Sequence, residues 1–299
     1  MQCERGLVVR NDGPRMWVGL GTEEVPCVLR GKLKREAQRV TSLVVVGDEV
    51  EVSRQPDGTG VIENICPRRS ELSRQGFHGY VHVIAANVDQ LLFVGAAQQP
   101  RFKLHLAERF LAIARRGRME AVVVISKCDL EHENTLKAWA APLEQAGVRV
   151  LYTSIMTGQG VDELRSLLSG KVSVLAGQSG VGKSSLVNAL FPEANIKTNA
   201  VSEVSSKGRH TTTSSRLYPL PGGGYLVDTP GIKSLELMEE DTDEEAIDDL
   251  YPEVTEAAAG CKFRDCTHTH EPQCAVKQAV SVGKIRRDRY QNFLRIRGA

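Results

Sequence analysis

A glycine-rich run in the middle of the chain has the residue types that bind phosphate. It follows an apolar stretch, Val172–Ala176, and precedes a helical pattern that ends before Pro192; its residues are Gly177, Gln178, Ser179, Gly180, Val181, Gly182, Lys183, Ser184 and Ser185. This is the complete P-loop pattern, in the strand-loop-helix context that it requires. Glycines let the backbone wrap so that its N–H groups and the helix N-terminus point at phosphate oxygens. The sequence therefore predicts a nucleotide phosphate site, against the alternative of a chance glycine-rich turn.

Side chains suited to a hard cation accompany this run. Lys183 would neutralise the β- and γ-phosphates, and the Ser184 hydroxyl would bind Mg²⁺, which prefers oxygen ligands. Asp228 ends a second apolar stretch and is expected to be another Mg²⁺ group, acting through water. In the polar loop between these two segments, Thr212 is favoured over Thr211 to complete the Mg²⁺ shell. The predicted ligand is a nucleotide with its magnesium ion.

A second pattern concerns the base of that nucleotide. Ser126, Lys127 and Asp129 follow the apolar run Ala121–Ile125 with the spacing of the Asn-Lys-x-Asp guanine motif. Asp129 would accept hydrogen bonds from the N1–H and N2 amine of guanine, and the stem of Lys127 would cover the base face. Ser126 replaces the asparagine, which is expected to lose an amide that ties this loop to its neighbours. Ser154 ends the next strand and resembles an element whose backbone contacts guanine O6. These residues favour a GTPase over a P-loop ATPase or nucleotide kinase.

The residues for hydrolysis are less conventional. Gly231 would present its N–H to the γ-phosphate, so the segment after it is expected to order with the triphosphate and to be released after hydrolysis. The next residue is Ile232, where many GTPases carry a glutamine that orients the attacking water. Since isoleucine cannot orient water, the isolated protein should be a slow GTPase. His210 is the candidate catalytic residue, because imidazole can orient or deprotonate water near neutral pH.

The C-terminal region holds a group of soft metal ligands. Cys261, Cys266, His268 and Cys274 have the spacing C-x4-C-x-H-x5-C, which suits a closed tetrahedral Zn²⁺ site, and His270 competes with His268 as the nitrogen ligand. Four protein ligands would leave no open position, so the single zinc ion would be structural. The alternative is that the cysteines are separate buried thiols.

The elements around these motifs indicate three domains, with 299 residues at roughly 100–200 per domain. Residues 1–69 contain five alternating or apolar runs separated by turn signals, which predicts a small β-barrel of OB or SH3-like type. After a polar connector at 67–74, residues 70–235 alternate strands and helices, which predicts an α/β domain with a mostly parallel, doubly wound sheet. Residues 236–299 hold the cysteine group and a basic C-terminal helix.

The positions of the expected strands follow from these runs. In the first domain they are 6–10, 16–20, 25–30, 49–54 and 61–65; in the second they are 88–94, 121–126, 149–153, 172–176, 215–220 and 225–228. Apolar residues at helical spacing predict a helix over 103–116.

Composition and charge exclude several classes of protein. The chain is 41% hydrophobic and 25% charged, as in a globular protein rather than a disordered or fibrous one. It has no apolar run near eighteen residues and no leader pattern, and its seven cysteines are an odd number, so a cytoplasmic protein with no membrane partner and no disulfides is expected. From residue 262 onward, nine basic residues face three acids, which could seat phosphates or form a solvated helical face.

The order of the motifs, with the base motif before the P-loop, resembles a circularly permuted GTPase. Together with the barrel, the Gly208–Thr213 loop, the cysteine group, and the segments 30–32 and 86–90, the chain resembles the ribosome small-subunit-dependent GTPase A family. The resemblance implies an OB-fold, a permuted GTPase domain and a mostly α zinc-binding domain. It also implies His268 as the zinc ligand, a catalytic switch-loop histidine, and binding to the small ribosomal subunit and its rRNA late in maturation, until GTP is hydrolysed to GDP and phosphate. A monomer is expected by default, and the rival hypothesis is an RNA-binding scaffold with an inactive nucleotide site.

Overall fold

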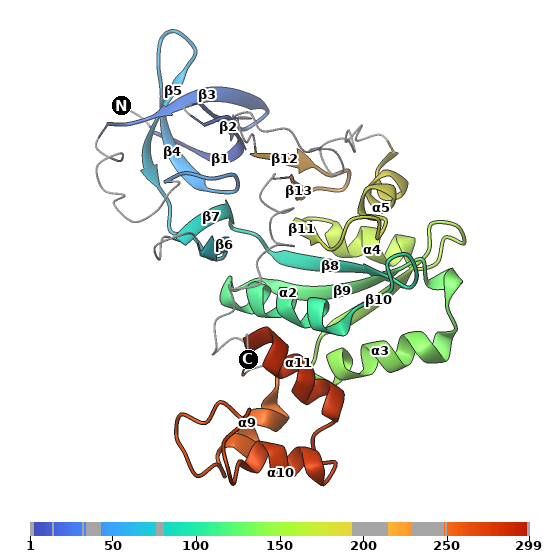
Figure 1. Cartoon of the computed structure of the whole chain (residues 1–299). Coiled ribbons are helices and arrows are strands. Elements are labelled where there is room, and N and C mark those ends of the chain that lie inside the picture. Colours follow the sequence, from blue (N-terminus) through green and yellow to red (C-terminus); the bar gives the residue numbers. More distant parts are fainter. Residues whose placement is uncertain are drawn as a thin grey trace, which may run out of the picture.

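A computed structural model of the chain describes residues 3–13, 15–31, 33, 43–75, 81–192, 215–228, 248 and 250–297. A central α/β unit lies between an N-terminal barrel and a group of C-terminal helices (Figure 1). In the described part of the chain no helix combines the length and the apolar character needed to cross a membrane.

The barrel is made of five strands in the order β1-β2-β3-β5-β4, and pairing of β1 with β4 closes it. Their bounds are Glu4–Asn11 (β1), Met16–Leu20 (β2), Glu23–Leu29 (β3), Glu49–Arg54 (β4) and Gly60–Ile65 (β5). Alternate side chains fill the interior, where Val8, Val18, Val50, Val52 and Ile62 are fully buried. This closed, OB-like barrel confirms the fold predicted for the first domain.

A hairpin follows the barrel where the sequence predicted a polar connector, so that prediction was wrong. Strands β6 (Glu71–Gln75) and β7 (Val81–Ala86) form a two-stranded antiparallel sheet. In β6, Leu72 is fully buried between polar neighbours, whereas β7 is mostly apolar and buried toward its end. A single apolar residue in the first strand gave too weak a period-2 signal for prediction.

The central sheet has the strand order β10-β9-β8-β11-β13-β12, in which neighbours are parallel except for the antiparallel pair β12 and β13. The strands are Gln90–Ala96 (β8), Glu120–Ser126 (β9), Arg149–Thr153 (β10), Val172–Ala176 (β11), Ser215–Pro219 (β12) and Tyr225–Asp228 (β13). The connecting helices are Leu104–Arg116 (α2), Cys128–Leu130 (η2), Glu133–Gln145 (α3), Val161–Leu168 (α4) and Lys183–Leu190 (α5). The predicted mostly parallel sheet is confirmed.

Helices cover both faces of this sheet, which explains the continuous apolar strands. Phe93 and Val123 belong to the core that includes residues of α2 and α3. Their neighbours in the same strands, such as Val94 and Val124, belong to the core that includes residues of α4 and α5. Alternate residues therefore serve opposite faces, and the carboxyl ends of β8, β9, β10 and β11 meet at one edge.

The barrel is joined to the central unit by backbone pairing. Strand β1 pairs antiparallel with β12, with Arg10 opposite Arg216 and Asn11 opposite Ser215, so one sheet of eleven strands runs through the described residues of both units. A buried ion pair holds the segment after β5 against the barrel, since Arg68 donates to both carboxylate oxygens of the fully buried Asp48 at 2.7 and 2.9 Å.

The C-terminal unit consists of α9 (Pro252–Ala258), α10 (Ala275–Ser281) and α11 (Arg287–Arg297). Helix α11 contacts α2 of the central unit, and Figure 1 shows it between α2 and the other two helices. Its Phe293 is 1% exposed and packs edge-on against Tyr251. Arg289 is also buried, so the basic C-terminal residues do not all belong to a solvated face.

Candidate functional site

The P-loop joins β11 to α5, and its glycines adopt backbone conformations that other residues rarely adopt. Gly177, Gly180 and Gly182 have φ values of +139°, +81° and +95°. A Cβ on Gly177 would lie 2.0 Å from the backbone oxygen of Val94 in β8, so this position also excludes any larger residue by contact. The loop is thereby pressed against the sheet edge, with the first turn of α5 directly behind it.

Lys183 is the first residue of α5, and its ammonium group lies over the loop. Its Nζ donates to the carbonyl oxygens of Gly177 and, at 2.8 Å, of Gln178. Ser184 follows it in the first helical turn and is half-buried. Both side chains predicted to contact phosphate and Mg²⁺ therefore start from the N-terminal turn of one helix, where the N–H groups favour anions.

One cavity of about 240 Å³ gathers the residues predicted to bind the base. Ser126, Lys127 and Asp129 come from the end of β9, Ser154 from the end of β10, and Gly182 and Ser185 from the P-loop and α5. The remaining wall consists of Leu130, Thr153, Ile155, Met156, Val181 and Leu186. Three segments far apart in the sequence meet at the carboxyl edge of parallel strands, the usual ligand position in such sheets.

Ser126 makes the connection that its replacement of asparagine was expected to lose. Its side chain is 3% exposed, and its Oγ donates at 2.5 Å to the backbone oxygen of Val181 in the P-loop. The carbonyl oxygen of Gly95 lies at 3.2 Å on the other side. The serine hydroxyl therefore ties the base motif to the P-loop, which corrects the expectation from the sequence.

Lys127 ties the same motif to a second loop. It adopts a left-handed conformation with φ of +54°, and its Nζ donates to the backbone oxygens of Gln99 at 2.7 Å and Gly180 at 2.9 Å. The ammonium group thus bridges the loop after β8 and the P-loop. Lys127 is also among the residues that line the cavity.

Ser154 fixes the turn on the opposite side of the cavity. It is 1% exposed, and its Oγ accepts from the N–H groups of Met156 and Thr157, both at 3.2 Å. Its own N–H donates to the carbonyl oxygen of Gln159 at 3.0 Å. The Ser154 hydroxyl is therefore used within the turn, which leaves the turn's backbone and the side chains after Ser154 to face the cavity.

Beyond the P-loop and α5, only the backbone of Asp228 is described among the residues predicted to act at the γ-phosphate. Asp228 is the last residue of β13, which pairs with β11, the strand that leads into the P-loop. Thr212, Gly231 and the candidate catalytic residue His210 lie outside the described residues, as does the side chain of Asp228.

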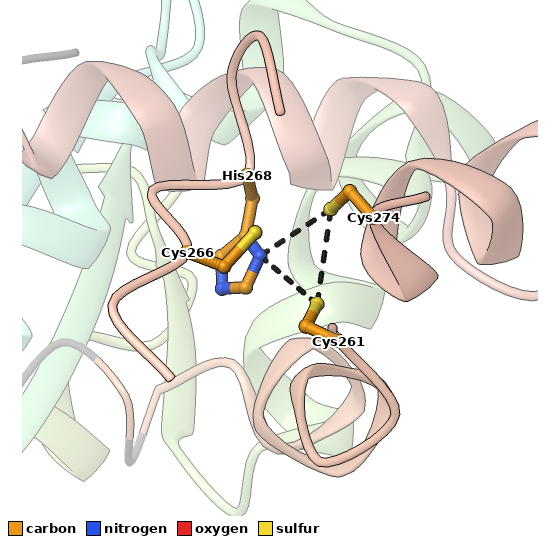
Figure 2. A group of neighbouring side chains, drawn as sticks. All are labelled: Cys261, Cys266, His268 and Cys274. Carbon is orange, nitrogen blue, oxygen red and sulfur yellow. Dashed lines mark hydrogen bonds between the residues drawn. The ribbon is translucent and has the colours of Figure 1, made fainter. Parts of the chain in front are cut away.

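The four predicted metal ligands of the C-terminal unit form one group (Figure 2). The Cys261 and Cys274 sulfur atoms are 3.9 Å apart, and they lie 3.6 and 3.5 Å from the Nδ1 atom of His268. Cys266 completes the group, and all four ligand atoms lie within 4.8 Å of one another. A tetrahedron with Zn–S of about 2.3 Å and Zn–N of about 2.0 Å has edges of about 3.8 Å between sulfurs and about 3.5 Å from sulfur to nitrogen. The distances among Cys261, Cys274 and His268 fit these edges, and with Cys266 beside them the group could bind one zinc ion.

The backbone around the ligands is held by hydrogen bonds. Tyr290 of α11 donates through its hydroxyl to the His268 carbonyl oxygen at 2.6 Å. The Glu271 carboxylate accepts from the N–H groups of Thr267 at 2.8 Å and Thr269 at 3.1 Å. Hydrogen bonds, led by that from the Thr267 side chain, lower the pKa of Glu271 to about 2. His270 is outside the group and has its Nδ1 2.9 Å from the Thr269 hydroxyl.

Sequence reasoning missed the apolar part of the base cavity. Leu130, Ile155 and Met156 line it, although Leu130 and Met156 belong to no recognised motif and Ile155 was noted only as part of the element that ends with it. Their positions in the sequence could have indicated this lining, because Leu130 directly follows Asp129, and Ile155 and Met156 directly follow Ser154.

Comparison with known proteins decides the family. Residues 65–238 match the model of the RsgA GTPase family. The chain is 37% identical to the small ribosomal subunit biogenesis GTPase RsgA of Bacteroides fragilis, over 97% of this chain and 95% of that protein. The RsgA of Gemmatimonas aurantiaca is 41% identical, over 92% and 90% of the two chains. This chain belongs to the RsgA GTPase family.

Solved structures agree with this assignment along almost the whole chain. The crystal structure of YjeQ from Thermotoga maritima is 35% identical, with a TM-score of 0.72 over 99% of this chain and 97% of that one. The structure of YloQ, described as a circularly permuted GTPase, is 31% identical with a TM-score of 0.68, over 98% and 93%. The RsgA-family resemblance and the permuted GTPase fold predicted from the sequence are both confirmed.

Proposed function

We propose that this RsgA-family protein is a GTPase that binds the small ribosomal subunit and its rRNA late in the subunit's maturation. It hydrolyses GTP to GDP and phosphate, with activity that the subunit stimulates. The relatives over nearly the whole length are small ribosomal subunit biogenesis GTPases by name, which supports the partner. The observation that carries the nucleotide is the cavity in which Asp129 and Ser154 face the P-loop residues Gly182 and Ser185.

The nucleotide would be held from three sides. Asp129 would accept from the guanine N–H groups, and Lys127 would cover the base while its ammonium keeps the P-loop in place. Ser126 would hold the base motif against the P-loop through Val181. The phosphates would lie on the N–H groups of residues 177–185, with Lys183 supplying positive charge.

Magnesium would accompany the triphosphate, and Ser184, Thr212 and Asp228 would hold it. Bound there, the ion would neutralise charge on the β- and γ-phosphate oxygens. Gly231 would donate its N–H to the γ-phosphate. His210 would orient the attacking water and accept its proton, because Ile232 cannot.

The three sequence units would have separate roles. Residues 1–69 and the basic C-terminal helix of 236–299 would dock on rRNA phosphates, while residues 70–235 carry the GTPase. One zinc ion on Cys261, Cys266, His268 and Cys274 would stabilise the C-terminal unit, whose ligand distances suit it. A ribosomal partner implies that the protein works in the cytoplasm, and we propose that it acts as a monomer.

A competition experiment tests the nucleotide assignment. GTP and GDP should displace a fluorescent guanine nucleotide in the presence of Mg²⁺, and ATP should be weaker by several kcal/mol because adenine leaves the Asp129 carboxylate without its donors. Asp129→Asn should shift the preference toward xanthine nucleotides. Equal competition by ATP and GTP would show that the site is that of a general P-loop ATPase or kinase.

A further inference from the structure

Exposed apolar side chains are concentrated at the rim of the base cavity. Among the described residues, the large hydrophobic side chains with high exposure are Val28, Val81, Leu130, Ile155, Met156, Phe263 and Val282. Three of these seven line the one cavity, with exposed fractions of 54% for Leu130, 44% for Ile155 and 82% for Met156. Apolar surface gathered at one concave site marks a place where a ligand removes it from water.

The backbone holds these exposed side chains in place. The Met156 N–H donates to the Ser154 Oγ at 3.2 Å, and the turn is closed by the Gly158 N–H, which donates to the Ser154 carbonyl oxygen at 2.9 Å. On the other side, the Leu130 N–H donates to the Lys127 carbonyl oxygen at 3.0 Å. These hydrogen bonds hold the backbone at Met156 and Leu130, and both side chains line the cavity.

We propose that Met156, assisted by Leu130, closes over the guanine base and sets the affinity of the site without setting its selectivity. This inference rests on the proposed nucleotide function of the cavity. A thioether is polarizable and makes favourable contacts with aromatic rings, and its flexible chain adapts to the ring. Contact with a ring does not distinguish one pattern of N–H donors from another, so selectivity stays with Asp129.

The same placement exposes the Met156 thioether to oxidation, which a bound guanine nucleotide would slow. Hydrogen peroxide transfers one oxygen atom to Sδ: the O–O bond breaks, the S–O bond forms, sulfur loses two electrons, and peroxide is reduced to water. The sulfoxide is polar and would lose the contact with the base. A bound base would in turn cover the sulfur and slow its oxidation. Met16 and Met119 are 3% and 6% exposed, so they are internal references for buried thioethers.

Affinity measurements on the full chain test the contact. Since Met156 is 82% exposed, Met156→Ala removes no core packing. It should weaken GTP and GDP binding together by about tenfold, the effect of burying part of an apolar side chain, with the preference for GTP over ATP unchanged. Met156→Leu should bind within about threefold of wild type, because volume-conserving swaps are tolerated. The matched control is Val282→Ala, which removes a side chain 63% exposed on the C-terminal unit and should leave binding unchanged.

Mass spectrometry after peroxide treatment tests the same contact through accessibility. Met156 should be oxidised much faster than Met16 and Met119, and GDP, but not ATP at the same concentration, should slow its oxidation several-fold. Oxidation of Met156 at equal rates with and without GDP, or a Met156→Ala variant that binds GDP as tightly as wild type, would overturn the proposal while leaving the guanine site intact. A wild-type protein that binds no guanine nucleotide would instead overturn the proposed function together with this inference.

Discussion

A buried ion pair connects the central unit to the C-terminal unit, and its removal should loosen that connection. Glu108 in α2 is 1% exposed and accepts from Arg289 of α11 and, at 2.8 Å, from the hydroxyl of Tyr251. Arg289 is 7% exposed and also donates at 2.8 Å to Glu253 and to the Leu250 carbonyl oxygen, while its guanidinium lies 4.1 Å from the Tyr251 ring centroid. Each of the three guanidinium nitrogens of this arginine therefore donates to a partner.

Arg289→Met keeps much of the side-chain volume but leaves the Glu108 carboxylate without its cation. Removing one partner of a buried pair costs about 3–5 kcal/mol. The assay is hydrogen exchange of the α11 amides, which measures the free energy of opening this interface. Protection should fall by about 10²- to 4 × 10³-fold, at about 1.4 kcal/mol per factor of ten. The double variant Glu108→Gln with Arg289→Met should lose less, because no unpaired charge remains.

The effect should also depend on pH with a defined sign. Burial raises the pKa of Glu108, and Arg289 opposes that shift. In Arg289→Met the positive charge that lowers the pKa of Glu108 is gone. The folded protein therefore holds a proton on Glu108 at pH values where the unfolded chain has released it. The variant is then relatively stable below the unfolded pKa of about 4.3 and loses stability as pH rises through the folded pKa.

Unfolding compared at pH 5 and pH 8 measures this difference, and the double variant is the control that cannot titrate at residue 108. If protection in α11 of Arg289→Met stays within about threefold of wild type, the Arg289–Glu108 pair does not hold this interface. Equal losses in the single and double variants would also refute this prediction, because they would show that the unpaired carboxylate is not the cause.

Three further changes probe the sites directly. Gly177→Ala should reduce GDP affinity by at least about tenfold, because its Cβ would lie 2.0 Å from a backbone oxygen, whereas Gly31→Ala in the barrel, where nothing lies within 4 Å, should bind GDP normally. Ser126→Ala should weaken GDP binding by about three- to tenfold through loss of one buried hydrogen bond, and an unchanged titration would contradict that role. Elemental analysis should find one zinc ion per chain, and chelation or Cys274→Ser should expose residues 250–297 to protease while the P-loop unit stays resistant. A metal-free preparation with a resistant C-terminus would show plain thiols.

The chemistry was visible in the sequence because phosphate and metal binding demand particular residues at short spacing. The P-loop between β11 and α5 and the Cys261–Cys274 group are local patterns, and the structure brings their members together. The sheet followed from apolar runs buried on both faces. Hairpin β6–β7 was missed because Leu72 alone marked its first strand.

What the sequence did not contain is the pairing of distant residues. Arg289 and Glu108 are 181 positions apart, so an arginine in a basic helix was indistinguishable from its solvated neighbours. The bond from Ser126 to Val181 spans 55 positions, and only the packing of β9 against the P-loop creates it. The joining of β1 to β12 likewise depends on how two separate units meet.

The protein is proposed to be a guanine-nucleotide hydrolase that small ribosomal subunits activate. The most direct test is the rate of GTP hydrolysis at saturating GTP and Mg²⁺, measured with and without purified small subunits, for wild type and for His210→Ala. We expect slow hydrolysis by the protein alone, strong stimulation of the wild type by small subunits, and GTP binding without stimulation for His210→Ala. A wild-type rate that small subunits do not change would contradict this proposal.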